Sequence, residues 1–338
     1  MSAESAGCRY PTGTPLTQYV VGASGECEPH HLRIPLELNE EGSHLNSQHP
    51  GPTAQPRWPC LFSTTIRSVS IPAARALQGH AERVRPLGHF DRVINVVIDD
   101  AIIAIATTSV GNGPFHVVVD KLPPRLPAGS SLWREGSAIR IGPWSLQMGP
   151  DTVVWDPRPA WCDIDLRNDL VDRLRERVRT TMLRRRDGPW SVALTTSTLI
   201  TATDLLEAAL ESGGAHRLNR ASGALAGLGP GLTPSGDDIL AGVLVAMWAA
   251  GYARRTIVSE AILSGATGRT TQLSLAFLKA AALGYVDERW HRLLASLSGS
   301  PADDLDAAVD RIMDFGASSG LDMLYGFVRG YAAVGRTS

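Results

Sequence analysis

The twelve residues 227–238, Gly-Leu-Gly-Pro-Gly-Leu-Thr-Pro-Ser-Gly-Asp-Asp, constrain the fold of this chain more than any other stretch. Four glycines and two prolines exclude the interior of a regular helix or strand. An apolar run, 239–252, follows at once and is long enough for about four turns of a buried helix. We therefore predict a glycine-rich loop that leads into a buried helix, with Thr233 or Ser235 as the N-cap residue.

The start of that helix is a candidate ligand site, because free N–H groups at a helix N-terminus bind anions. Asp237 and Asp238 lie in this first turn, where they would repel a bound phosphate. They fit such a site if a cation such as Mg²⁺ bridges them to the ligand, or if one carboxylate orients a substrate amide or acts as a base. Consecutive helical residues point about 100° apart, so we expect one acid to face the ligand and the other to stabilise the loop. The alternative is an ordinary capped helix start.

The composition is that of a globular protein, since 43% of the 338 residues are hydrophobic and 20% are charged. A net charge of −2 provides no basic surface for nucleic acid or for an anionic membrane. The four cysteines show no metal-binding spacing, the first residues do not resemble a signal peptide, and no apolar run is long enough to span a bilayer. We therefore expect a cytoplasmic protein that binds a small anionic molecule.

The order of patterns along the chain predicts an α+β protein. Residues 1–58 are rich in proline, glycine, serine and histidine, which is typical of a disordered extension. In residues 59–157, β-branched runs such as 92–98 and 101–106 alternate with short turns, which predicts an antiparallel sheet or a small barrel. Residues 158–338 show helical periodicity and contain the glycine-rich loop, so we expect a helical domain there.

A second glycine-rich helix start near the C-terminus has the same form as the first. Residues 318–322, Ser-Ser-Gly-Leu-Asp, again combine hydroxyls, a glycine and an acid. Ser319, Gly320 and Asp322 are therefore predicted to face the first helix start, so that both ends hold one polar ligand. The alternative is two ordinary helix caps.

Three shorter stretches allow more than one interpretation. Asn112 and Gly113 follow a predicted strand and are candidates for the ligand site, although Asn-Gly is also the usual sequence of a hairpin turn. Thr271 and Ser274 lie about one turn apart on a predicted helix, where their hydroxyls either contact a ligand or bond to the preceding backbone turn. The basic run 184–186 is interpreted as a solvated helix end, because basic residues favour a helix C-terminus.

Taken together, these motifs resemble those of a bacterial family long labelled a domain of unknown function. The family includes a subunit of oxamate carbamoyltransferase from anaerobic allantoin degradation. The resemblance is carried by 227–238 with the following Ala241-Gly242, and by Gly111-Asn112-Gly113-Pro114 after a strand. Thr271 with Ser274, and Ser319-Gly320 with Asp322, add to it by their order in the chain.

The resemblance implies an enzyme or enzyme subunit that works with other protein subunits. It would transfer a carbamoyl group between a small amide or carboxylate metabolite and phosphate, with Mg²⁺ as the one cofactor that the acids suggest. The alternative is a non-catalytic assembly or ligand-binding subunit that docks a partner through its glycine-rich loops. The candidate catalytic residues are Asp237 and Asp238. The candidate substrate-binding residues are Asn112, Gly113, Gly229, Gly231, Thr233, Ser235, Gly236, Thr271, Ser274, Ser319, Gly320 and Asp322.

Overall fold

The computed structural model describes residues 18–21, 27–30, 59–78, 83–187, 190–300 and 304–336. The chain divides into two compact units, Met1–Pro56 and Arg57–Ser338. In the first unit, strand β1 (Gln18–Val21) pairs antiparallel with strand β2 (Cys27–His30). The rest of the predicted disordered extension, residues 1–58, lies outside the described residues.

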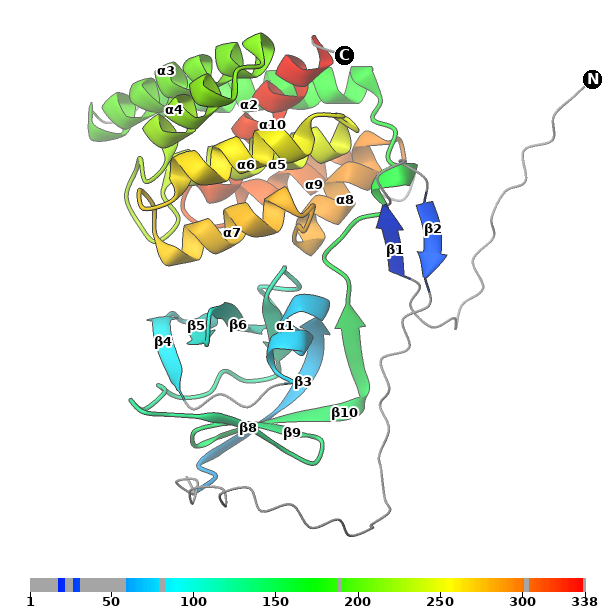
Figure 1. Cartoon of the computed structure of the whole chain (residues 1–338), viewed down its shortest axis with the longest axis vertical. Coiled ribbons are helices and arrows are strands. Elements are labelled where there is room, and N and C mark those ends of the chain that lie inside the picture. The colour runs from blue at the N-terminus through cyan, green and yellow to red at the C-terminus, as the bar shows by residue number, and fades with distance from the viewer. Residues whose placement is uncertain are drawn as a thin grey trace, which may run out of the picture. The chain divides into compact units, whose positions relative to one another are not determined.

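Eight strands of the second unit form one sheet in the order β4-β5-β6-β7-β3-β10-β9-β8 (Figure 1). The helices follow the sheet in sequence, which confirms the predicted α+β class. The strands are β3 (Phe62–Ser70), β4 (Val84–His89), β5 (Val93–Ile98), β6 (Ala101–Thr107), β7 (His116–Val119), β8 (Leu132–Glu135), β9 (Ala138–Ile141) and β10 (Trp144–Trp155).

The sheet is mixed and strongly curled. Strand β10 runs parallel to β3, strand β7 runs parallel to β6, and the remaining neighbours are antiparallel. The short turn predicted between the runs 92–98 and 101–106 is a two-residue hairpin at Asp99-Asp100. Asp99 adopts the positive φ of 52° that such a tight turn requires. The N–H of Val84, at the start of β4, donates to the carbonyl of Ser130, just before β8, at 2.7 Å. The two edges of the sheet therefore approach one another, although the strands do not close into a full barrel.

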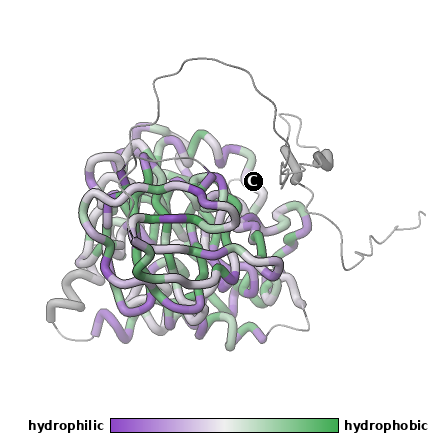
Figure 2. The backbone as a smooth tube through the Cα atoms, turned by 90° about the horizontal axis from the view of Figure 1, so that it is seen from below, coloured by the Kyte–Doolittle hydropathy of each residue, from purple (hydrophilic) through white to green (hydrophobic). Residues whose placement is uncertain are grey.

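An apolar core fills the curled sheet. It contains Ile66 and Val69 from β3, Ile105 from β6 and Trp144 from β10, each at most 1% exposed. The short helix α1 (Ile71–Ala76) closes this core, with the Ser70 hydroxyl as its N-cap. In the hydropathy colouring of Figure 2, hydrophobic stretches run through the interior of the unit and hydrophilic stretches are more frequent along its outer turns.

The helical part begins with a short 3₁₀ turn (Trp161–Asp163) after the last strand. Its helices are α2 (Asn168–Arg186), α3 (Trp190–Ser212), α4 (Ala215–Leu225), α5 (Ser235–Ala249), α6 (Arg255–Ala266), α7 (Gln272–Ala282), α8 (Glu288–Leu297), α9 (Leu305–Met313) and α10 (Ser319–Gly335). The predicted domain boundary after residue 157 stays a prediction. Among the described residues, no helix combines the length and the apolar character that a membrane crossing requires.

Helix α5 lies at the centre of the helical core, and α10 packs along it in the most extensive helix–helix contact of the described chain. Glycines make this close approach possible. A Cβ atom on Gly242 would lie 2.0 Å from the Met323 carbonyl oxygen, and one on Gly326 would lie 2.0 Å from the Ile239 carbonyl oxygen. Only glycine fits at these two positions, so the two backbones are in direct contact.

The sheet meets the helices through α7 and α8. Val97 and Ile102 of the sheet pack against Leu273 of α7, and the rings of Phe115 and Phe277 lie 5.1 Å apart. These contacts fix the sheet beside α7, and the N-cap of α7, Thr271, contacts the glycine-rich loop at Leu232.

Candidate functional site

The glycine-rich loop between α4 and α5, residues 226–234, is hereafter called the central loop. At three of its positions the backbone conformation favours glycine. Gly227, Gly229 and Gly231 have φ values of +74°, +116° and +98°. A Cβ atom on Gly229 would lie 2.9 Å from the backbone nitrogen of Ser235, so the loop is folded tightly onto the helix start. At Gly231, by contrast, a Cβ atom would meet no described atom within 4 Å.

The loop backbone itself caps helix α5. The N-cap residue is Pro234, and no side chain makes a capping hydrogen bond. Instead, the N–H of Gly236 donates to the carbonyl of Leu228 at 2.8 Å. The predicted cap by Thr233 or Ser235 is therefore wrong, because the folded-back loop supplies the capping acceptor and leaves both hydroxyls available for other contacts.

Asp237 stabilises the central loop. Its carboxylate accepts the Gly227 N–H at 3.1 Å and a short hydrogen bond from the Thr270 hydroxyl. Burial raises the pKa of this carboxyl, and the hydrogen bonds from Thr270 and Gly227 oppose that rise. This agrees with the expectation that one of the two consecutive acids stabilises the loop.

Thr271 and Ser274 hold the other side of the central loop. Thr271 is the N-cap of α7, where its hydroxyl accepts the Ser274 N–H at 3.0 Å. Both hydroxyls donate to the carbonyl of Leu232, at 2.6 Å from Thr271 and 3.3 Å from Ser274. The structure therefore places both candidates beside the loop, with their hydroxyls occupied by its backbone.

The start of α10 meets the start of α5, as the paired motifs predicted. The hydroxyl oxygens of Thr233 and Ser319 lie 3.2 Å apart, and those of Ser235 and Ser318 lie 3.4 Å apart. A Cβ atom on Gly320 would lie 1.7 Å from the Ile312 carbonyl oxygen, so this glycine lets the start of α10 pack against α9. The two helix starts thus form one polar cluster.

Two carboxyl groups are buried in this cluster. Asp238 is 8% exposed and Asp322 is fully buried. In each of them the Oδ2 atom has no hydrogen-bond partner within the described part of the chain. An unpartnered buried acceptor costs about 1–3 kcal/mol, so such atoms mark a place where a ligand or a proton is expected.

The pKa values of both carboxyl groups are raised. Burial lifts the pKa of Asp238 well above its usual range; the Ser319 hydroxyl opposes this, and the charges of Asp322 and Asp237 add to it. Burial also raises the pKa of Asp322, but there the neighbouring Arg185 guanidinium opposes the rise. The two acids therefore differ mainly in that Asp322 has a cationic partner.

Arg185, in the last turn of α2, completes the cluster. Its guanidinium forms a short ion pair with Asp322, and its Nη2 atom lies 3.5 Å from the Ser235 hydroxyl oxygen. The interpretation of residues 184–186 as a solvated helix end is therefore wrong for Arg185. The buried stripe of α2 continues to Arg185 with helical spacing, and this periodicity is the sequence signal that identifies it. That stripe consists of Val171, Leu174, Val178 and Met182.

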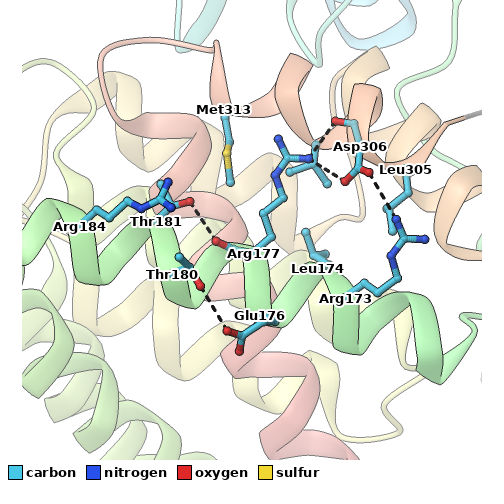
Figure 3. Close-up of a pocket in the computed structure, with 11 residues that line it drawn as sticks. Arg173, Leu174, Glu176, Arg177, Thr180, Thr181, Arg184, Leu305, Asp306 and Met313 are labelled. Atoms are coloured by element: carbon cyan, nitrogen blue, oxygen red, sulfur yellow. Dashed lines mark hydrogen bonds and ion pairs between the residues drawn. The ribbon is translucent and has the colours of Figure 1, made fainter.

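A pocket of about 420 Å³ opens beside Arg185 and the start of α10. Its lining residues are Thr181, Arg185, Met313, Ala317, Ser318 and Leu321. A second pocket, of about 500 Å³, lies between α2 and α9 and shares Thr181 and Met313 with the first (Figure 3). In that second pocket Arg173 and Arg177 are both paired with Asp306 (Figure 3). Arg177 also pairs with Asp310, so both guanidinium groups already have carboxylate partners.

Asn112 and Gly113 lie at a different place, where the sheet meets α8. The Asn112 side-chain amide donates to Glu288 at 2.9 Å and accepts the Ser68 hydroxyl at 2.5 Å. A Cβ atom on Gly113 would lie 2.6 Å from the His116 ring. The structure therefore does not bring these two candidates to the paired helix starts, because their contacts join the sheet to α8.

Within the residues that the structure describes, no group of three histidine, cysteine, aspartate or glutamate side chains is placed to hold a metal ion. The ion pair between Arg185 and Asp322 also puts a positive charge where a cation would bind. The cluster thus consists of carboxyl groups, hydroxyls and one guanidinium.

The raised pKa of Asp238 predicts a pH-dependent stability. Between about pH 4, where an unfolded aspartate titrates, and the higher folded pKa, the folded protein binds more protons than the unfolded chain. The free energy of unfolding should therefore fall as the pH rises through this window. In Asp238→Asn this contribution is absent, so the stability of the variant relative to the parent should increase with pH. Urea unfolding of both proteins at a series of pH values measures the free energy of unfolding of the variant minus that of the parent. A value that stays constant or falls as the pH rises contradicts the prediction.

The fold and the cluster together define an α+β protein with a buried, carboxyl-rich site at two facing helix starts. Residues 225–331 match the family model described as oxamate carbamoyltransferase subunit AllH. This match supports membership in that family and agrees with the resemblance seen in the sequence. The family description indicates a carbamoyltransferase-related subunit. The matched segment holds Asp237, Asp238 and Asp322 but begins after Arg185 and the sheet. No solved structure matches the chain.

Proposed function

We propose that this chain is a subunit of a carbamoyl-transferring enzyme, and that a small carbamoylated metabolite binds between the starts of α5 and α10. The reaction would transfer the carbamoyl group between an amide or carboxylate metabolite and phosphate. The observation that carries the proposal is the pair of buried carboxyl groups of Asp238 and Asp322, each with one oxygen atom that has no partner among the described residues. Both acids lie in the segment that matches the family model.

The polar groups of the cluster suit a carbamoyl compound. A carbamoyl group carries an NH₂ donor, which the free carboxyl oxygens of Asp238 or Asp322 can accept. The carbamoyl group also carries a carbonyl oxygen, and metabolites that contain a carbamoyl group are commonly anionic. The Arg185 guanidinium and the Ser318 hydroxyl line the adjacent pocket and can bind an anionic group.

Such a transfer requires positioning and the stabilisation of a tetrahedral oxyanion, and needs no covalent nucleophile from the protein. Rigid elements supply the positioning here, because the cluster lies on the first turns of two helices whose backbones are in contact. We assign the ligand-facing role to Asp238 and Asp322, and the loop-stabilising role to Asp237.

A second candidate function is a non-catalytic subunit that docks a partner through the central loop. One observation favours it: Leu232, in the central loop, is 41% exposed, and Phe90, after β4, is 46% exposed. A Cβ atom on Gly88 would contact both side chains, so they lie on the same surface. The family description names a subunit, which implies other subunits that would cover such an apolar surface.

Ligand titration separates the two candidates. We expect the purified chain, alone or with its partner subunits, to bind oxalurate, oxamate or carbamoyl phosphate. A ligand at about 100 times its Kd should raise the free energy of unfolding by roughly 2.7 kcal/mol. The Asp238→Ala variant should lose this stabilisation, whereas Leu232→Ser should keep it and lose only assembly. If the parent assembles with its partners but no carbamoyl compound stabilises either form, the docking function is the better description.

A further inference from the structure

The two buried carboxyl groups have unequal surroundings. Asp322, on α10, is paired with the Arg185 guanidinium from α2. Asp238, on α5, has no cationic partner in the described chain. Burial raises its pKa, the Ser319 hydroxyl opposes this, and the charges of Asp322 and Asp237 add to it. Asp237 is itself held by the Gly227 N–H and the Thr270 hydroxyl.

Two buried carboxyl groups that interact do not ionise independently. The first ionisation occurs at the group with the better stabilised charge, and this charge then opposes the ionisation of its neighbour. A guanidinium that bonds directly to one of them decides which group ionises first, because it favours the charged form of that group alone. Here the guanidinium contacts Asp322.

We infer that Arg185 is a positioning residue that keeps Asp322 ionised, so that Asp238 holds the proton of the pair. The cluster then presents a hydroxyl donor at Asp238 next to a carboxylate acceptor at Asp322. The pKa directions agree with this order, since burial raises the pKa of Asp238 well above its usual range and raises that of Asp322 against the opposing effect of Arg185.

This arrangement specifies a ligand that accepts one hydrogen bond and donates another side by side, as an amide or carbamoyl group does. A ligand that only accepts hydrogen bonds, such as sulfate, would leave the Asp322 oxygen without a partner. This part of the inference rests on the proposed function. The protonation order itself is a property of the ligand-free protein.

The experiment is a carbon-13 NMR titration of ligand-free protein labelled at the aspartate carboxyl carbon. Asp238→Asn and Asp322→Asn assign the two signals. In the parent, the Asp238 signal should titrate at a clearly higher pH than the Asp322 signal. In Arg185→Gln, the two signals should titrate over the same range with two-step curves, because neither carboxyl group then has a cationic partner.

Arg177→Gln is the matched control, because Arg177 lies on the same helix and pairs with Asp306 and Asp310, away from the cluster. Both titration curves should stay as in the parent. Arg185→Lys retains the positive charge, so Asp322 should still ionise before Asp238. This variant replaces Arg185→Gln in the test if Arg185→Gln does not fold. The inference is wrong if the Asp238 signal of the parent titrates at a lower pH than the Asp322 signal. It is also wrong if a folded Arg185→Gln variant shows the same titration curves as the parent.

The same samples distinguish this inference from the proposed function. If the protonation order is found but neither oxamate nor oxalurate shifts the two signals, the order stands and the carbamoyl ligand is wrong. If a carbamoyl compound binds while Asp238 is ionised, the proposed function stands and the role of Arg185 is wrong.

Discussion

Asp322→Asn is expected to lower the free energy of unfolding by about 3–5 kcal/mol, the usual effect of removing one partner of a buried ion pair. The carboxylate is fully buried, and the Arg185 side chain that it neutralises is only 17% exposed. Without Asp322 the guanidinium remains in the cluster with no counter-ion. Urea unfolding at neutral pH measures the loss, and the variant should also fail to bind a carbamoyl ligand.

Asp306→Asn provides the comparison for this variant. Asp306 pairs with Arg173 and Arg177, but its side chain is 59% exposed. Exposed pairs contribute about 0–1 kcal/mol, so the loss should stay within that range. Equal losses in the two variants would mean that the Asp322 pair is no more important to the fold than a surface pair.

Gly326→Ala should lower the free energy of unfolding by about 3 kcal/mol, at the upper end of the effect of overpacking a core. The added methyl group would lie 2.0 Å from the Ile239 carbonyl oxygen, which belongs to the backbone of α5 and cannot rotate away. Helix α10 would have to shift along or away from α5. Because the two helix starts carry Asp238 and Asp322, ligand binding should weaken as well.

A matched glycine lies at the end of the same helix. A Cβ atom on Gly335 would meet no described atom within 4 Å, so Gly335→Ala should leave stability unchanged or raise it by up to about 1 kcal/mol. Gly242→Ala, on the facing helix, should resemble Gly326→Ala. If alanine at position 326 is tolerated as well as at position 335, the direct backbone contact between the helices is not required for stability.

The local chemistry of the sequence predicted the parts of the site that lie close together along the chain. The glycine and proline content of 227–238 indicated a glycine-rich loop, and the apolar run after it indicated a buried helix; both are present. The two hydroxyl-glycine-acid motifs predicted facing helix starts because they share one form and could hold one polar ligand from both sides. These features are local, so a single sequence can reveal them.

The parts that the sequence did not reveal depend on distant contacts. The cap of α5 comes from a loop carbonyl at Leu228, and no residue type encodes such a backbone acceptor. The parallel pairing of β3 with β10 joins strands that are far apart in the chain, so hairpin signals could not predict it. Arg185 looked like one of three equivalent arginines, and only its position on the buried stripe of α2 distinguishes it.

The ion pair between Arg185 and Asp322 closes a loop of 137 residues. Contacts this remote form only after the entropy of loop closure has been overcome, whereas the caps of α5 and α7 can form as each helix does. A fragment that begins at residue 225 would therefore contain both acids of the cluster and still lack its one cation. The electrostatic character of the site is thus a property of the assembled chain, and it would serve as a reporter of complete folding in any refolding or fragment-complementation experiment.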